Sequence, residues 1–182
     1  MKIYEITGAN GFEELQLRNY EQKKYCIDWL ESDVSIRDKW NDDIEVDIIT
    51  KGKKSDCPFI WVGKGVMVIS ENAKEKLESY WIDDCIELLP IKCKEGVYYL
   101  LHVIDVRNIS FDFKIEIGNR KVNFNKLECI KNKIDVNGLF RGYYQGDKLD
   151  KRIFITERFK DSVKNSTLKG FDFREIWDSE EL

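Results

Sequence analysis

Two segments of the chain align without gaps, and they constrain the fold more than any other feature. They are ISENAKEKL at residues 69–77 and ITERFKDSV at residues 155–163. In both, an apolar run ends at a residue whose side chain suits a helix N-cap, Ser70 or Thr156, and a glutamate that complements the helix dipole follows. We therefore expect helices over residues 70–81 and 156–166, each between two strands. The same capping preferences also produce such junctions by chance, so the repeat indicates no chemistry by itself.

The stretch between these helices favours strands. Residues 97–104 are almost continuously apolar, as in a strand covered on both faces, and residues 111–117 alternate strictly. Gly118 and Asn119 then predict a hairpin turn into residues 120–124. Because strands outnumber helices and mostly lie beside their sequence neighbours, we expect an α+β fold. Its core would be a mainly antiparallel sheet with two similar strand–helix–strand units packed on it.

The first third of the chain is less regular. Residues 2–7 and 44–48 alternate as short half-buried strands. Between residues 12 and 30, apolar residues follow an imperfect helical pattern, which we interpret as a helix. Pro58 excludes a central strand at its own position, because proline cannot donate to a ladder.

Composition excludes several classes of protein. The 182 residues are 42% hydrophobic and 13% aromatic, which is enough to bury a core, and the formal net charge is −4. No apolar run approaches the roughly 20 residues of a membrane-spanning helix, and the N-terminus has no apolar signal region. The five cysteines lie at scattered spacings: Cys26, Cys57, Cys85, Cys93 and Cys129. They indicate reduced, mostly buried thiols, so we expect a cytoplasmic protein without a metal site.

No catalytic constellation stands out. His102 is the one histidine of the chain and lies inside an apolar run, so it is more typical of a packed, hydrogen-bonded residue than of a catalytic base. The glycine-containing stretches at residues 63–65 and 142–146 match neither phosphate-binding fingerprint. Neighbouring aspartates such as Asp42 and Asp43 point to opposite faces of a strand, and they cannot share a metal ion unless a turn redirects one. We therefore expect no catalytic residues, no metal and no cofactor.

Charge is unevenly distributed along the chain. Residues 28–47 contain eight acidic and two basic residues, a local net charge of −6, and include Trp29 and Trp40. Residues 119–133 contain five basic residues and one acidic residue, a net charge of +4. Either stretch can be plain solvated surface. The tryptophans favour an interface in the acidic stretch, because aromatic anchors dominate interface energetics.

Several motifs resemble those of one bacterial family. They are VISENAK at residues 68–74, LLPI at 88–91, YYLLHV at 98–103 leading to Asp112, LFR at 139–141, IFITERFK at 153–160 and LKGFDF at 168–173. These motifs resemble immunity protein family eleven of the polymorphic toxin systems. The resemblance covers residues 57–177 of a single domain, 1–182, in which residues 1–56 would be an N-terminal elaboration. It implies a protein that binds and neutralises a cognate toxin, and it carries over no catalytic residue.

We place the toxin interface in the acidic stretch. The residues are Asp38, Trp40, Asp42, Asp43 and Glu45. Toxins that act on nucleic acid present basic grooves, so the expected partner is a basic, nuclease-like toxin domain, with neither membrane nor nucleic acid as a partner. In the competing interpretation, Trp40 packs into the core and the acids merely solvate an edge. The alternative function is a non-enzymatic small-ligand or nucleic-acid-binding regulatory module, indicated only by residues 119–133 and the aromatic content.

Overall fold

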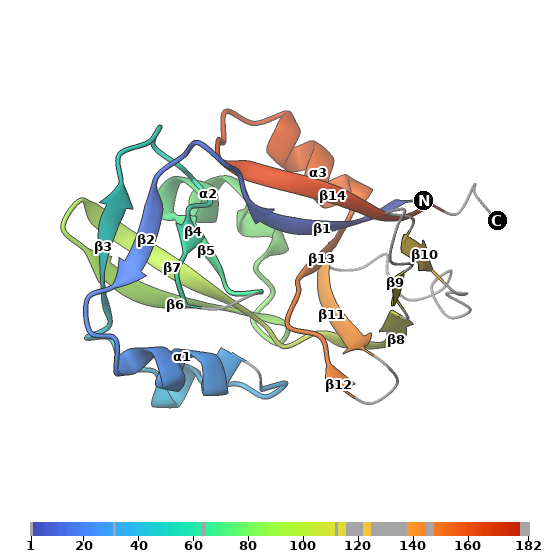
Figure 1. Cartoon of the computed structure of the whole chain (residues 1–182), viewed down its shortest axis with the longest axis horizontal. Helices are drawn as coiled ribbons and strands as arrows, with labels where there is room; N and C mark the ends of the chain where they lie inside the picture. The colour runs from blue at the N-terminus through green and yellow to red at the C-terminus, as the bar shows by residue number, and fades with distance from the viewer. Residues whose placement is uncertain are drawn as a thin grey trace.

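The structure is a computed structural model with mixed sheets and few helices, so the fold is α+β or mostly β (Figure 1). It describes residues 2–30, 32–62, 65–111, 113–115, 122–124, 138–144 and 148–178. Where we expected one sheet, the described strands form two six-stranded sheets and one two-stranded sheet. Most of their pairings are antiparallel, as predicted, and three are parallel.

The first sheet joins the two ends of the chain. Its strands are β1 (Lys2–Gly8), β8 (Val106–Phe111), β11 (Leu139–Tyr144), β12 (Lys148–Leu149), β13 (Phe154–Thr156) and β14 (Phe171–Asp178). Their order is β12-β11-β13-β1-β14, with β8 paired in parallel to β11. Strand β1 confirms the strand predicted at residues 2–7. It is antiparallel to both neighbours, with Tyr4 opposite Ile155 of β13 and Ile6 opposite Phe173 of β14.

The second sheet holds most of the middle of the chain. Its strands are β2 (Glu14–Leu17), β3 (Glu45–Thr50), β4 (Phe59–Ile60), β5 (Met67–Ser70), β6 (Ile86–Cys93) and β7 (Gly96–Val103). Their order is β4-β2-β3-β6-β7-β5. Strand β3 confirms the strand predicted at residues 44–48, and β4, directly after Pro58, is an edge strand, as the proline requires.

Both predicted capped helices begin where the sequence places them. Helix α2 (Glu71–Lys76) follows β5, and α3 (Glu157–Lys164) follows β13. Helix α2 is shorter than expected, since the chain continues as the 3-10 helix η2 (Glu78–Tyr80). The Ser70 hydroxyl accepts a hydrogen bond from the Ala73 N–H at 3.1 Å, whereas the Thr156 side chain makes no capping bond.

The two helix-containing segments are less alike than their sequences. The strands that flank each helix do not pair with each other, because β7 lies between β5 and β6, and β1 lies between β13 and β14. The segments also belong to different sheets. The prediction that they form two similar units on one sheet is therefore not confirmed.

Two hydrophobic cores lie on opposite faces of β5, β6 and β7. The first core is formed with the other sheet and with helices α2 and α3, and includes Phe159 and Ile155. The second is formed by the second sheet with α1 (Gln22–Leu30), through Cys26. Along β7, Tyr98 and Leu100 face the second core, and Leu101 and Val103 face the first. This confirms the prediction that residues 97–104 form a strand covered on both faces.

The predicted helix over residues 12–30 is wrong in its first half, where β2 forms instead. Leu15 and Leu17 lie two residues apart, so a strand turns both toward one face, and both are buried in the second core. The helix α1 begins only at Gln22. After α1, the chain forms the short 3-10 helix η1 (Arg37–Lys39) and then enters β3.

The predicted hairpin is present as strands β9 (Phe113–Ile115) and β10 (Val122–Phe124), which pair antiparallel with Val122 opposite Ile115. The turn itself, with Gly118 and Asn119, lies outside the described residues. So does the rest of the basic stretch at 119–133, apart from β10. Within the described ranges, every helix is too short or too polar to cross a bilayer.

Candidate functional site

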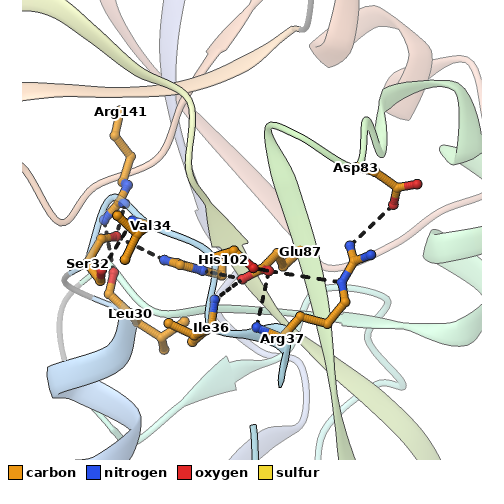
Figure 2. Close-up of polar contacts among 10 residues, drawn as sticks. Leu30, Ser32, Val34, Ile36, Arg37, Asp83, Glu87, His102 and Arg141 are labelled. Atoms are coloured by element: carbon orange, nitrogen blue, oxygen red, sulfur yellow. Dashed lines mark hydrogen bonds and ion pairs between the residues drawn. The ribbon is translucent and has the colours of Figure 1, made fainter. Parts of the chain in front are cut away.

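The segment that follows α1, residues 32–43, carries most of the predicted interface, and a buried polar network holds it in place. Figure 2 shows the contacts running from Arg141 through Ser32 and His102 to Glu87, Arg37 and Asp83. We call Glu87, His102 and Arg141 the buried clamp. Its members come from β6, β7 and β11, so both sheets contribute to it.

Arg141 forms the first part of the buried clamp. It is 2% exposed, and its guanidinium donates to two backbone carbonyls, Leu30 O at 2.9 Å and Ser32 O. Burial lowers the pKa of Arg141 to about 10, although the nearby charge of Asp33 opposes the shift. The Nε atom of Arg141 has no hydrogen-bond partner among the described residues. The end of α1 is thus held by a strand more than a hundred residues further along the chain.

Glu87 and His102 form the second part. They face each other across β6 and β7, and His102 Nδ1 lies 2.8 Å from Glu87 Oε2. The other ring nitrogen, Nε2, lies 2.9 Å from Ser32 O. A carbonyl oxygen only accepts, so Nε2 carries a proton and donates. This confirms the prediction that His102 is a packed, hydrogen-bonded residue: its side chain is fully buried.

The Glu87 carboxylate organises the turn that leads into η1. It accepts hydrogen bonds from Ser35 Oγ at 2.5 Å, Ile36 N at 3.1 Å and Arg37 N at 3.2 Å. Burial by itself raises the pKa of Glu87, but the hydrogen bonds from Ser35, His102 and Ile36 outweigh it and hold the pKa below its usual value. The buried carboxylate therefore holds the backbone of residues 35–37 in place by accepting hydrogen bonds from it.

Just beyond the buried clamp, the surface is hollowed. The hollow measures about 310 Å³ and is lined by Arg37, Trp40, Asp42, Trp81, Asp83, Ile86, Leu88, Leu89 and Pro90. We call it the tryptophan hollow. Trp40 is half-buried, packs against the second core and donates from Nε1 to Pro90 O at 2.9 Å. Trp81 donates from Nε1 to Lys74 O at 2.7 Å and packs against the first core.

The structure brings together only part of the predicted interface. Trp40 and Asp42 both line the tryptophan hollow, whereas Asp38, Asp43 and Glu45 do not. Asp38 is exposed on η1. Asp43 pairs with Lys92 at 2.9 Å, and Glu45 on β3 pairs with Arg18. Trp40 packs against the second core, as in the competing interpretation that treats it as a core residue. It also lines the hollow, so part of the ring can contact a partner. The Trp29 side chain lies outside the described residues.

The interface predicted from the sequence contains only two of the nine residues that line the tryptophan hollow; the charged and aromatic ones it lacks are Arg37, Trp81 and Asp83. Arg37 was counted only as a charge, and Trp81 and Asp83 lie about 40 residues from Trp40. Arg37 Nη2 lies 3.2 Å from the Asp83 carboxylate. The available signal was a tryptophan followed closely by two aspartates at residues 81–84. Nothing local to that motif indicates that it meets residues 37–42.

A second, larger hollow of about 630 Å³ lies near the start of α2. Three lysines line it, Lys53, Lys54 and Lys169, together with Asp56. The Asp56 carboxylate is occupied, because it accepts from Ser70 Oγ at 2.7 Å, from Asn72 Nδ2 at 2.9 Å and from the Lys169 N–H at 2.9 Å. Glu71 and Glu95 also line this hollow, so its three lysines are matched by three carboxylates and it has no excess of positive charge.

Among the cysteines of the described residues, two are buried and two, Cys85 and Cys93, are half-buried. Cys26 and Cys57 are buried, and burial raises the pKa of the Cys26 thiol to about 12 and that of Cys57 above its usual range. Cys129 lies outside the described residues. Across the described ranges, no group of three or more His, Cys, Asp or Glu side chains is placed to hold a metal ion.

In comparisons with known proteins, this chain matches no protein-family model and no curated protein sequence.

Proposed function

We propose that this protein is an immunity protein that binds and neutralises a cognate toxin of a bacterial polymorphic toxin system. Neutralisation works by protein–protein contact in the cytoplasm, without turnover, metal or cofactor. The partner is a basic, nuclease-like toxin domain, and the biological role is protection in competition between bacteria. The two strand–helix–strand segments, together with β7 and β11, carry the family-like motifs and belong to the scaffold in this proposal.

The observation that carries the proposal is the preformed surface at residues 32–43. The buried clamp fixes the backbone from Ser32 to Arg37, and the bond from Trp40 Nε1 to Pro90 O holds the indole, so Trp40 is in place before any partner arrives. Fixed groups lose less conformational entropy on binding than mobile ones, which is what a tight inhibitor requires. The chemically capable groups behind this surface, Glu87 and His102, are buried and engaged with the chain's own backbone.

The family-like motifs support a scaffold role. Leu139, Ile155 and Phe159 from these motifs are all buried and pack in the core between the first sheet and α3. Arg141, in the LFR motif, holds the segment that carries the interface. The acidic stretch lies outside the region of resemblance, as expected if the scaffold is shared and the partner-reading surface differs from one member to the next.

Charge gives the surface its partner preference. Asp38, Asp42 and Asp43 are exposed, and an acidic surface can occupy the basic groove that a nuclease uses for phosphate. Complementary charge also accelerates encounter, with rates on the order of 10⁸ M⁻¹s⁻¹ at low salt. Trp40 adds an apolar anchor, and truncation of such an anchor costs about 2 kcal/mol of binding.

The test is co-expression with the toxin domain encoded beside this gene, with growth rescue and co-purification as readouts. The charge-reversal variant Asp42→Lys/Asp43→Lys should fold, bind more weakly and lose the salt sensitivity of association. The matched control, Glu75→Lys/Glu78→Lys, makes the same change of charge at exposed residues of α2 and η2 and should protect like the wild type. Wild-type protein that neither binds nor protects would refute the function. A folded Asp42→Lys/Asp43→Lys variant with unchanged binding and salt sensitivity would refute the interface.

The second candidate function is a small-ligand or nucleic-acid-binding regulatory module. The larger hollow near α2 favours it, since about 630 Å³ can hold a small ligand and Lys53, Lys54 and Lys169 could bind an anionic group of that ligand. The neighbouring genes discriminate between the two functions. A large adjacent toxin with a variable C-terminal domain supports the immunity protein, and a genome without one supports the regulatory module.

A further inference from the structure

The tryptophan hollow has walls that are fixed before a partner arrives. The indole N–H of Trp40 is already bonded to Pro90 O, and that of Trp81 to Lys74 O. Each ring also packs on one of the two hydrophobic cores. Because both N–H groups are used by the chain's own carbonyls, the two rings offer a ligand aromatic surface rather than a hydrogen-bond donor.

The polar groups of the hollow are mainly carboxylates that are available to a ligand. Asp42 has no hydrogen-bond or ion-pair partner within the described ranges. Among the residues that the structure describes, Asp83 pairs with Arg37 alone, at 3.2 Å, and 86% of the Asp83 side chain is exposed. An ion pair this exposed contributes little, so a ligand can replace it at small cost.

Aromatic walls beside carboxylates select a cation. The negative face of an indole attracts a cation, and a guanidinium both stacks on such a ring and binds a carboxylate through two parallel N–H groups. The chain itself already places a guanidinium here, that of Arg37 on Asp83. An ammonium group, which is compact and strongly hydrated, gains less from a partly apolar hollow.

We infer that the tryptophan hollow is the receptor for an arginine side chain that projects from the basic surface of the toxin. The inference rests on the proposed function, and it names the group on the partner that is read. Arginine enters between Trp40 and Trp81 and bonds Asp42, while Arg37 moves away from Asp83 to admit it. Arginine is also a residue that nuclease grooves use for phosphate, so its capture removes it from the substrate.

The test uses the protein alone, with N-acetyl-arginine methylamide as the probe. The matched probe is N-acetyl-citrulline methylamide, which has the same shape without the charge, and ionic strength is held constant. The readout is the set of five indole N–H signals in a ¹⁵N–¹H spectrum, assigned with single Trp→Phe variants. Trp61, which is 55% exposed and is not among the residues that line the hollow, reports non-specific association.

The expected result is that the Trp40 and Trp81 signals shift saturably with arginine, with a dissociation constant on the order of millimolar. Citrulline should bind at least about fivefold more weakly, and the Asp42→Asn variant should weaken arginine binding by a similar factor. Arg37→Gln should strengthen it, because Asp83 is then released. Equal responses to arginine and citrulline, equal shifts of Trp61, or an unchanged Asp42→Asn variant would overturn the inference.

The two experiments distinguish failure of this inference from failure of the proposed function. Wild-type protein that neutralises the toxin but shows no arginine selectivity keeps its proposed function and loses this inference. If the wild-type protein binds the arginine probe but rescues no growth, the arginine that the hollow binds does not come from a toxin. That result overturns both the inference and the proposed function.

Discussion

Replacing Glu87 by glutamine changes one oxygen into an amide nitrogen at the centre of the buried clamp. The wild-type carboxylate accepts from four donors: Ser35 Oγ, Ile36 N, Arg37 N and His102 Nδ1. Glutamine keeps the shape but has one acceptor oxygen, and its NH₂ group faces donors. About two of the four bonds are therefore lost, and the remaining donors stay buried.

The expected cost follows from those losses. A hydrogen bond to a charged group contributes about 1.5–3 kcal/mol, so the loss of two gives about 3–6 kcal/mol. The donors left unpaired stay buried, which adds to the cost, and we expect Glu87→Gln to lower the free energy of unfolding by about 3–5 kcal/mol. This is a large part of the roughly 5–15 kcal/mol by which a domain is stable.

The assay is urea unfolding followed by tryptophan fluorescence and circular dichroism, with the free energy of unfolding extrapolated to water. The matched control is Asp83→Asn, the same carboxylate-to-amide change at a side chain that is 86% exposed, which should cost less than about 1 kcal/mol. If Glu87→Gln does not fold, Ser35→Ala removes a single donor and should cost about 1–2 kcal/mol. A stable Glu87→Gln variant that loses less than about 1 kcal/mol, or a Ser35→Ala variant without effect, would refute the reasoning.

The same residue predicts a pH dependence. The pKa of Glu87 is lower in the folded chain than in the unfolded one, so its contribution is fully present above the unfolded pKa and is lost as pH falls through the folded pKa. Between about pH 5 and pH 3, the wild type should therefore lose more unfolding free energy than Glu87→Gln. Parallel curves for the two proteins would contradict this.

Three further predictions concern other parts of the fold. His102→Gln should lower the free energy of unfolding by about 2–3 kcal/mol, because two buried hydrogen bonds are broken. Growth protection should persist at temperatures where the variant is folded, and loss of protection with normal folding would contradict this. Ser70→Ala should cost about 1–2 kcal/mol in urea unfolding, since it removes the hydrogen bond that caps α2. Thr156→Ala should cost less than half as much, because the Thr156 side chain makes no capping bond, and equal effects would refute the capping argument. Gly170→Ala should cost about 2 kcal/mol or more in thermal unfolding, because φ is +86° and the added Cβ would lie 1.9 Å from Ser55 Oγ. An unchanged melting temperature would contradict this and show that the backbone around Gly170 adjusts freely.

Much of the local structure could be predicted from the sequence. The starts of α2 and α3 follow from a capping residue and a glutamate at each junction, and the burial of β7 follows from its continuous apolar run. These features depend on contacts within a few residues. The error at residues 12–30 arose in the same way, since Leu15 and Leu17 fit an imperfect helix as well as a strand until a second sheet supplies their partners.

The candidate site could be predicted only in part. The acidic charge and Trp40 are visible in the sequence, and the interface placed on them stays a prediction. The tryptophan hollow depends on Trp81 and Asp83, which precede β6, whereas Trp40 precedes β3. The pairing of β3 with β6 is a tertiary contact, so no pattern near Trp40 indicates these two residues.

The sequence by itself determined which residues seek the interior and where the helices begin, because side-chain direction repeats with a fixed period along a strand or helix. Only the tertiary structure decided which surfaces meet. Arg141 reaches Leu30 across 111 positions of the chain, and His102 reaches Ser32 across 70. Such contacts form only after both sheets are assembled, since a buried guanidinium or carboxylate is tolerable only where distant backbone groups satisfy it. The physical reason is that burial and hydrogen bonding depend on all the elements packed around a group, whereas a sequence pattern describes one element at a time.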